Sequence, residues 1–197
     1  MRGVAGLVLT GGASRRFGAD KALLLVDGER LGDRAMRVLS MVAAPVLEVG
    51  PAFTGPAAVR EAPLGGGPLV AMAAGGAAMS SGDPSPGTVI VLAVDLPCID
   101  WSTLAWLADH PATDSVIPVV DGQAQSLCAR YTIDALDVAG ELVDRGERSV
   151  RVLLDSIAVH YADESEWGAV TSKRTFTDVD TREDATALGI EMPKSPG

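Results

Sequence analysis

Near its start the chain reads Leu9-Thr10-Gly11-Gly12-Ala13-Ser14-Arg15-Arg16-Phe17-Gly18-Ala19-Asp20-Lys21, directly after the apolar run 3–9. Adjacent glycines let a backbone bend sharply and bring several N–H groups close to one anion, because no Cβ blocks the approach. Arginine and lysine side chains supply positive charge at the rim of the same loop. A strand that leads into a glycine loop with clustered cations predicts a polyphosphate-binding loop.

This loop differs from the two common nucleotide-binding loops. A P-loop needs four residues between its glycines and then Gly-Lys-Ser/Thr, and no such run follows here. The dinucleotide fingerprint needs Gly-x-Gly-x-x-Gly, whereas Gly11 and Gly12 are adjacent and the next glycine is Gly18. The full spacing, Leu-x-Gly-Gly-x-x-x-Arg-x-Gly-x-Asp-Lys, resembles the signature of the MobA-like nucleotidyltransferases. Taken alone, the segment could also be a tight turn whose charges are solvated.

Composition bounds the class of protein. The 197 residues suit one domain, and 47% hydrophobic and 21% charged residues are ordinary for a soluble globular chain. We assign 1–190 to the domain and 191–197 to a flexible tail. A net charge of −10 argues against a nucleic-acid-binding surface, which would normally be basic.

The sequence also predicts a location. No segment approaches the roughly 20 apolar residues that cross a bilayer, and the run 3–9 is too short for a secretory signal. We therefore expect no membrane association and a cytoplasmic protein. Cys98, Cys128, His110 and His160 have no metal-site spacing, so the cysteines are interpreted as small buried hydrophobes and the histidines are given no role.

Short apolar runs alternate with helical patterns, which predicts a single three-layer, Rossmann-like α/β domain with a mostly parallel central sheet. Strands are expected at 4–9, 45–49, 57–59, 88–94, 115–120 and 126–131, the last two joined by a turn. Helices are expected at 31–41, 69–79, 102–109, 133–144, 150–154 and from Thr181, where Thr181 to Asp184 is similar to a capping box.

Asp95 follows the most strand-like run of the chain, 88–94. Ligands of open parallel sheets bind just beyond the carboxyl ends of the strands, so Asp95 lies where a site is expected. The stretch 91–97 resembles the family's strand-Asp-x-Pro element, which implies that Asp95 binds magnesium. A turn or helix cap is the alternative role for this side chain.

Other segments resemble further elements of the family in the expected order. Residues 178–184 resemble an Asn-x-Asn-Thr-x-Glu-Asp element in which Asp178 and Asp180 replace the asparagines, which implies that Asp180 is a second metal ligand; a helix-capping loop is the alternative. Residues 65–69 match a Gly-Pro-Leu element beside the nucleobase, which implies a role for Gly67. Glu61 falls, across a one-residue gap, near a nucleotide-contacting aspartate.

The acceptor side follows the same resemblance. Residues 121–131 resemble the family's Gly-x-x-Gln-Pro-Leu stretch, with Ser126 in place of proline. Residues 146–151 resemble a segment near the pterin phosphate, which implies Arg148 and Arg151 as acceptor-binding residues; a solvated helix face is the alternative. Gly50-Pro51 stands where the family often has an asparagine, and Thr10 and Phe17 also depart from its pattern.

The resemblance implies a division of roles among the loop residues. Leu9, Gly11, Gly12, Lys21, Glu61, Gly67 and Asp95 would bind the nucleotide, and Arg16, Lys21 and Asp95 would be catalytic. Arg16 and Lys21 would stabilise charge on the phosphates and on the pyrophosphate leaving group. The acceptor is a phosphate monoester with a second pKa of about 6, so it is already largely dianionic and no catalytic base is required.

The resemblance extends from Leu9 to about Leu188 and implies a guanylyltransferase. It would transfer GMP from Mg-GTP to the terminal phosphate of molybdenum-loaded molybdopterin, and release pyrophosphate. Magnesium is the implied cofactor, and transient contact with proteins that insert or receive the product cofactor is implied as well. The alternatives are a cytidylyltransferase, a transferase for another phosphorylated acceptor, and a non-catalytic nucleotide or cofactor carrier. Gly11-Gly12 and Asp20-Lys21 favour guanine.

Overall fold

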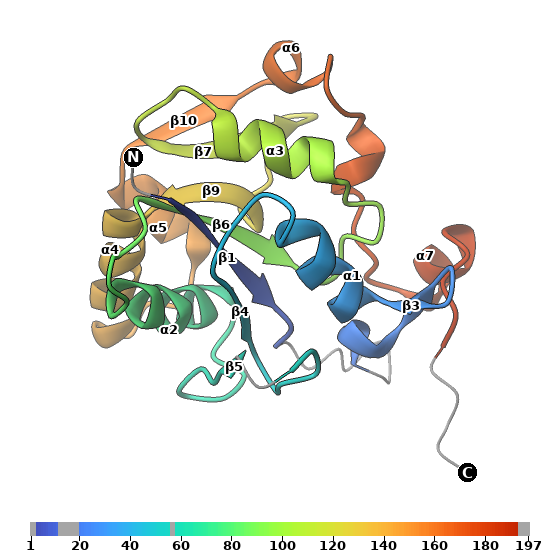
Figure 1. Cartoon of the computed structure of the whole chain (residues 1–197), viewed down its shortest axis with the longest axis horizontal. Helices are drawn as coiled ribbons and strands as arrows, with labels where there is room; N and C mark the ends of the chain where they lie inside the picture. Colours follow the sequence, from blue (N-terminus) through green and yellow to red (C-terminus); the bar gives the residue numbers. More distant parts are fainter. Residues whose placement is uncertain (1–2, 12–19, 56–57, 193–197) are drawn as a thin grey trace.

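The computed structural model of the chain describes residues 3–11, 20–55 and 58–192. Its central sheet has the strand order β10-β7-β9-β6-β1-β4-β5, with β8 paired to β7 (Figure 1). The strands are β1 (Val4–Leu9), β4 (Val46–Val49), β5 (Ala58–Val59), β6 (Thr88–Ala93), β7 (Ser115–Val120), β8 (Gln123–Ala124), β9 (Cys128–Thr132) and β10 (Val159–Ala162). The pairs β1–β4, β1–β6, β4–β5 and β7–β10 are parallel, while β9 runs antiparallel to both β6 and β7.

Helices cover both faces of this sheet, which confirms the predicted three-layer α/β architecture (Figure 1). Helices α2 (Pro68–Ser80), α4 (Ile133–Asp144) and α5 (Val150–Ser156) pack on one face, and α1 (Leu31–Leu39) and α3 (Trp101–Asp109) on the other. Along β1, Leu7 faces the first group and Val8 the second; along β6, Val91 and Ile90 divide in the same way. Burial on both faces explains why these strands are continuous apolar runs.

The elements absent from the sequence prediction are short. They include β8, β10, the helix α6 (Glu164–Trp167), the 3-10 helices η1 (Lys21–Leu23) and η2 (Lys173–Phe176), and the hairpin of β2 (Leu25–Val26) and β3 (Glu29–Arg30). The hairpin turn is Asp27-Gly28, whose two positive φ angles of 51° and 79° are typical of a two-residue hairpin. That dipeptide was a signal that the prediction missed.

The last helix, α7 (Arg182–Ala187), begins as expected. Thr181 accepts a hydrogen bond from the Asp184 N–H, and the Asp184 carboxylate accepts one from the Thr181 N–H, which confirms the capping box. Glu191 then exchanges two backbone hydrogen bonds with Leu25, so the chain remains attached to the domain at that point. The division into a domain over 1–190 and a tail over 191–197 stays a prediction.

The parallel strands bring three loops to one edge of the sheet. The segments that follow β1, β4 and β6 begin at Thr10, Gly50 and Val94. The Thr10 N–H donates to the Val49 carbonyl (3.0 Å), and the Val94 N–H donates to the Leu9 carbonyl (3.2 Å). These bonds extend the pairing past the strand ends and hold the loops side by side. Among the described helices, none is long and apolar enough to cross a membrane.

Candidate functional site

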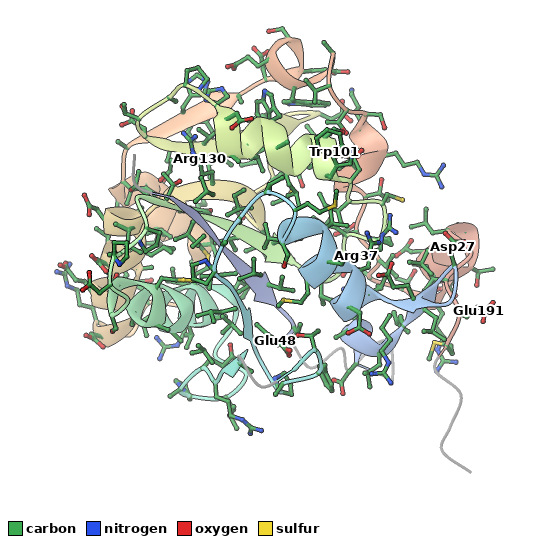
Figure 2. The ribbon with its side chains drawn as sticks, in the orientation of Figure 1. Asp27, Arg37, Glu48, Trp101, Arg130 and Glu191 are labelled. Atoms are coloured by element: carbon green, nitrogen blue, oxygen red, sulfur yellow. The ribbon has the colours of Figure 1, made fainter. Side chains whose placement is uncertain are left out.

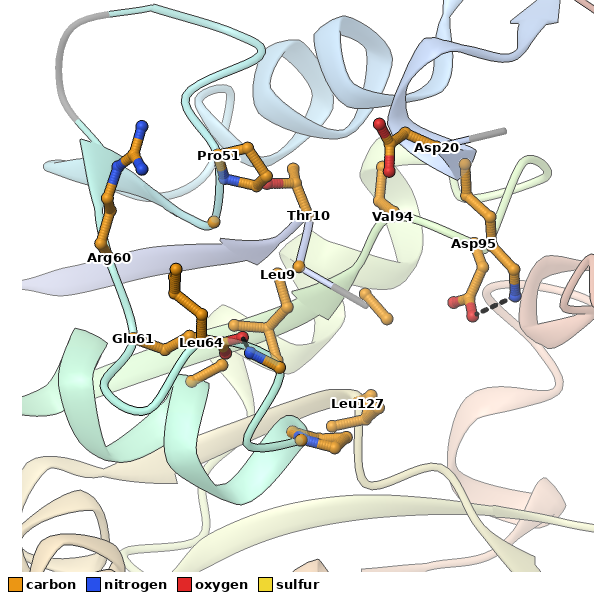
Figure 3. Close-up of a pocket in the computed structure, with 18 of the residues that line it drawn as sticks. Leu9, Thr10, Asp20, Pro51, Arg60, Glu61, Leu64, Val94, Asp95 and Leu127 are labelled. Carbon is orange, nitrogen blue, oxygen red and sulfur yellow. Dashed lines mark hydrogen bonds and ion pairs between the residues drawn. The ribbon is translucent and has the colours of Figure 1, made fainter. Parts of the chain in front are cut away.

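A cleft of about 1050 Å³ opens at the carboxyl ends of β1, β4 and β6 (Figure 3). This is the edge where an open parallel sheet binds its ligands. The residues predicted from the sequence that line this cleft are Leu9, Gly11, Lys21, Glu61, Gly67, Asp95 and Asp180. Gly12 and Arg16 lie outside the described residues, so their assignment stays a prediction.

One end of the cleft holds a cluster of Lys21, Asp95 and Asp180. The Lys21 Nζ lies 3.1 Å from Asp95 Oδ2 and 2.7 Å from Asp180 Oδ1. The Val179 N–H donates to the Asp95 carbonyl (3.0 Å), and this bond holds the segment with Asp180 against the end of β6. Asp95 and Asp180, which lie 74 and 159 positions from Lys21 in the sequence, thereby contact the same ammonium group.

The protonation state of Lys21 follows from its two partners. Partial burial acts to lower the pKa of the ammonium, but the hydrogen bonds and charges of Asp180 and Asp95 outweigh it and raise the pKa above its ordinary value. Lys21 is therefore charged at neutral pH. Asp178, close by, has a raised pKa because of burial and of the neighbouring charges of Asp180 and Asp95.

Glu61 occupies the opposite end of the cleft (Figure 3). Its side chain is buried, and its Oε1 accepts a hydrogen bond from the Gly65 N–H (2.7 Å). Oε2 has no hydrogen-bond partner among the residues that the structure describes. Gly67 is the N-cap of α2, with a φ of +93° that favours glycine, and Pro68 is the first residue of the helix. The cleft therefore has a buried carboxylate at one end and a charged cluster at the other.

A buried carboxylate that the sequence analysis did not single out is that of Glu48 on β4, a residue that is only 1% exposed (Figure 2). Its Oε1 accepts from the Thr10 hydroxyl (2.6 Å) and the Phe53 N–H (2.9 Å). Its Oε2 accepts from the N–H (2.7 Å) and the hydroxyl (2.5 Å) of Thr54. Burial would raise the pKa of Glu48, but these bonds outweigh it and lower the pKa, so the carboxylate stays charged. A carboxylate within an otherwise apolar strand, just before Gly50, was the available signal.

Two positions that depart from the family pattern, Thr10 and Gly50, lie beside the Glu48 network. Thr10 is buried, and its hydroxyl donates a hydrogen bond to Glu48. A Cβ at Gly50 would lie 2.2 Å from the Thr10 Oγ1 and 2.9 Å from the Gly11 nitrogen. With threonine at position 10, position 50 therefore has room only for glycine. Glu48 joins the start of the glycine loop to the loop after β4, and both line the cleft.

The comparisons with known proteins agree with this geometry. Residues 6–161 match the family model described as MobA-like NTP transferase domain. The chain belongs to the MobA-like NTP transferase family. A curated relative from Opitutus terrae, named probable molybdenum cofactor guanylyltransferase, is 38% identical over 159 residues, which cover 75% of this MobA-like chain and 76% of the relative.

Solved structures share the fold at lower sequence identity. The molybdopterin-guanine dinucleotide biosynthesis protein A of Archaeoglobus fulgidus has a TM-score of 0.77 and 20% identity, and the match covers 93% of this chain and 96% of that one. A Mycobacterium tuberculosis protein solved in complex with manganese has a TM-score of 0.66 and 17% identity, with 95% and 97% covered. The family and the fold predicted from the sequence are thus confirmed.

A smaller cavity of about 200 Å³ in the MobA-like domain adjoins the cleft and shares Ala93, Asp95 and Leu127 with it. Its other lining residues include Gln125, Ser126 and Asp178, so part of the predicted acceptor stretch does reach this position. Neither Arg148 nor Arg151 is among the described residues that line the cleft or the smaller cavity. Arg148 instead donates to the carbonyls of Val143 and Glu147. An acceptor role for these two arginines stays a prediction.

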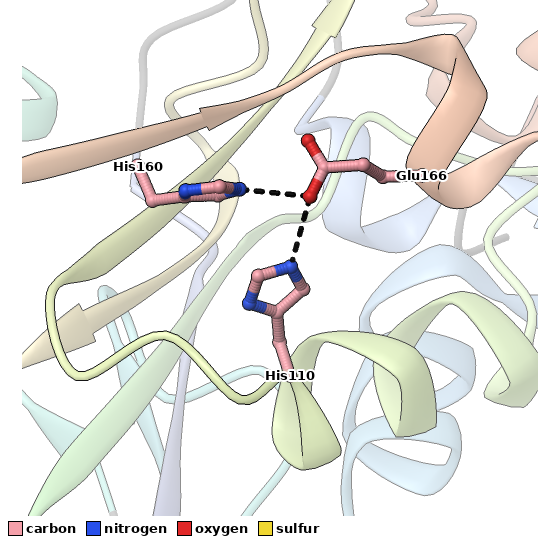
Figure 4. A group of neighbouring side chains, drawn as sticks. All are labelled: His110, His160 and Glu166. Atoms are coloured by element: carbon pink, nitrogen blue, oxygen red, sulfur yellow. Dashed lines mark hydrogen bonds and ion pairs between the residues drawn. The ribbon is translucent and has the colours of Figure 1, made fainter.

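A second cluster consists of His110, His160 and Glu166 (Figure 4). The sequence analysis gave its two histidines no role. Glu166 Oε2 is 2.8 Å from the His160 Nε2 and 3.4 Å from the His110 Nε2. The Ala112 N–H donates to Nδ1 of His110 (3.2 Å), which places the proton of the neutral ring on Nε2. In that tautomer Nε2 has no free lone pair for a metal. The cluster therefore ties α3, β10 and α6 together by hydrogen bonds.

This arrangement predicts a loss of stability in acid. The His110 side chain is only 7% exposed, and burial lowers its pKa, partly offset by the bond to Glu166. A lowered pKa means that the unfolded chain binds this proton more readily, so stability is complete above about pH 6.5 and falls as the pH drops through the folded-state pKa. We expect the Tm to fall by a few degrees between pH 7.5 and 5.5, and less in His110→Asn, whose amide oxygen can still accept from Ala112. Equal pH slopes in the two proteins would contradict this.

Proposed function

We propose that this MobA-like chain transfers GMP from Mg-GTP to the terminal phosphate of molybdenum-loaded molybdopterin in the cytoplasm. The observation that carries the proposal is one cleft with Glu61 at one end and Lys21, Asp95 and Asp180 at the other. A nucleobase held at Glu61 would direct its phosphates along the cleft toward Lys21 and the two aspartates. The name of the Opitutus terrae relative supports the same reaction.

The charged cluster fits a divalent metal. The carboxylates of Asp95 and Asp180 converge on a single point, now contacted by the Lys21 ammonium, and hard carboxylate oxygens are the ligands that Mg²⁺ prefers. Asp95 and Asp180 would hold the ion. When bound, it would neutralise charge on the triphosphate. The manganese complex of the Mycobacterium tuberculosis structure is consistent with a divalent ion in this fold.

The chain's own residues would position the reactants. The glycine loop and Lys21 bind the phosphates, and the acceptor phosphate enters from the side of the small cavity next to Asp95. An oxygen of the acceptor phosphate attacks the α-phosphorus of GTP, and the bond from that phosphorus to the bridging oxygen breaks. Pyrophosphate leaves with the electron pair. The acceptor is already dianionic, so positioning and charge neutralisation are the work of the protein.

Glu61 supplies a chemical reason for the choice of guanine. A buried carboxylate accepts hydrogen bonds only, and guanine presents two neighbouring donors, the ring N1–H and the amino group. Adenine and cytosine present a ring nitrogen acceptor there, which a carboxylate would repel. We expect Glu61→Gln to raise the KM for GTP about ten- to hundredfold, because a charge-assisted hydrogen bond contributes roughly 1.5–3 kcal/mol. Unchanged KM and base preference in this variant would remove Glu61 from base recognition.

The experiment that tests the proposal is pyrophosphate release with magnesium, molybdenum-loaded molybdopterin and each of GTP, CTP and ATP. Release with GTP alone supports the guanylyltransferase. A preference for CTP would replace it by the cytidylyl reaction. Nucleotide binding without release for any of the three would point to another acceptor phosphate or to a non-catalytic carrier. Transient contact with proteins that insert or receive the cofactor stays a prediction.

A further inference from the structure

The position of the Lys21 ammonium has a consequence for metal binding. Its Nζ contacts one oxygen of Asp95 (3.1 Å) and one of Asp180 (2.7 Å), and these are the two carboxylates proposed to hold the metal. A divalent cation needs the same oxygens at about 2.1 Å. A lysine ammonium in this position would therefore occupy the metal's place and repel it.

We propose that Lys21 and the divalent metal exclude each other at the Asp95–Asp180 pair, so that the metal enters together with the nucleotide. The inference rests on the proposed function, because it takes the nucleotide to be a triphosphate. Without nucleotide, the Lys21 ammonium offsets one of the two negative charges of this carboxylate pair. When the triphosphate binds, the ammonium gains a new anionic partner and leaves the carboxylates to the metal.

The charges around the cleft make this exchange necessary. The described charged residues that line it are Lys21 and Arg60 against Asp20, Glu61, Asp95 and Asp180. If Lys21 left the pair without a replacement cation, two carboxylates would face each other unneutralised. If the triphosphate entered with Lys21 still on the pair, it would meet this carboxylate excess. The two binding events are therefore coupled, and by linkage each ligand raises the affinity for the other.

The local structure allows the exchange without movement of the backbone. Lys21 is the first residue of η1, and its four-carbon stem can carry the ammonium over several ångströms by rotamer changes alone. The Asp180 side chain is 64% exposed, which leaves a path from solvent to the pair. Asp180 stands where the family element has an asparagine, so in this chain the ammonium is held by a second full negative charge.

The test measures the affinity of the full chain for Mn²⁺ in the absence of nucleotide. Binding is monitored by the electron paramagnetic resonance signal of the free ion and by calorimetry. We expect weak binding by the wild type, and binding at least about tenfold tighter in Lys21→Met and Lys21→Gln, because a repelling unit charge has been removed. Lys21→Arg retains the charge and should keep the weak binding. The matched control is Arg60→Met, which removes a cation from the same cleft away from the pair, and should leave Mn²⁺ affinity within about twofold.

The outcomes separate this inference from the proposed function. Thermal melts establish that each variant is folded. Two neutral replacements of Lys21 are used so that the test can still be made if one of them does not fold. Mn²⁺ binding that is no tighter in Lys21→Met and Lys21→Gln than in the wild type would overturn the exclusion, whatever the protein catalyses. Conversely, tighter binding in these variants together with no pyrophosphate release from the wild type would leave the exclusion standing and remove the guanylyl transfer.

Discussion

Replacement of Asp95 by asparagine is expected to reduce transfer at least about a thousandfold while the fold survives. The side chain lies at the end of β6 and shares the Lys21 ammonium with Asp180. Loss of one of the two carboxylates proposed to hold the metal would remove several kcal/mol of charge stabilisation on the triphosphate, and roughly 1.4 kcal/mol is a factor of ten in rate. The measurement is kcat from pyrophosphate release at saturating GTP and magnesium.

The stability of this variant should change little. The hydrogen bond that positions the neighbouring segment uses the Asp95 carbonyl, which asparagine retains. Asp109→Asn, at the exposed end of α3, is the matched control and should have wild-type rates. A thermal melt verifies that each variant is folded. Wild-type-like turnover by folded Asp95→Asn would remove Asp95 as the metal ligand.

Replacement of Glu48 by leucine should have the largest effect on stability. Leucine has a similar size but accepts no hydrogen bonds, so the Thr10 hydroxyl, the Phe53 N–H and both Thr54 donors would lose their acceptor. A buried donor left unsatisfied costs roughly 1–3 kcal/mol, so a loss of about 3–5 kcal/mol in the free energy of unfolding is expected even if water reaches some of them. Chemical denaturation of the two proteins measures it.

A matched control variant separates the effect of losing the buried hydrogen bonds from the effect of losing a negative charge. Glu141 is 65% exposed on α4 and pairs only with Arg145 among the described residues, so Glu141→Leu should change stability by no more than about 0.5 kcal/mol. Glu48→Leu should also weaken nucleotide binding at temperatures where it is folded, because Thr10 and Pro51 line the cleft. Equal stability of the two leucine variants would show that the buried network is not required.

Much of the fold followed from patterns between neighbouring residues. The continuous apolar runs at β1 and β6 identified these two strands, and helical spacing located α1 and α4. Asp95 could be assigned to a site because it directly follows a buried strand. Elements of two to four residues, such as β8 and β10, were missed because so short a segment has no periodicity and is ordered by the strand beside it.

The sequence by itself determined the order of the longer strands and helices and the place of the Asp95 carboxylate at the end of β6, since each depends on local backbone preference and on burial pattern. Only the tertiary structure decided that Asp180 meets Lys21 across 159 positions, that Glu48 holds two loops, and that Arg148 lies away from the cleft lining. Such contacts depend on which strands are neighbours and on where the chain returns to the sheet edge. That information is spread over the whole packed core, and no short stretch of residues contains it.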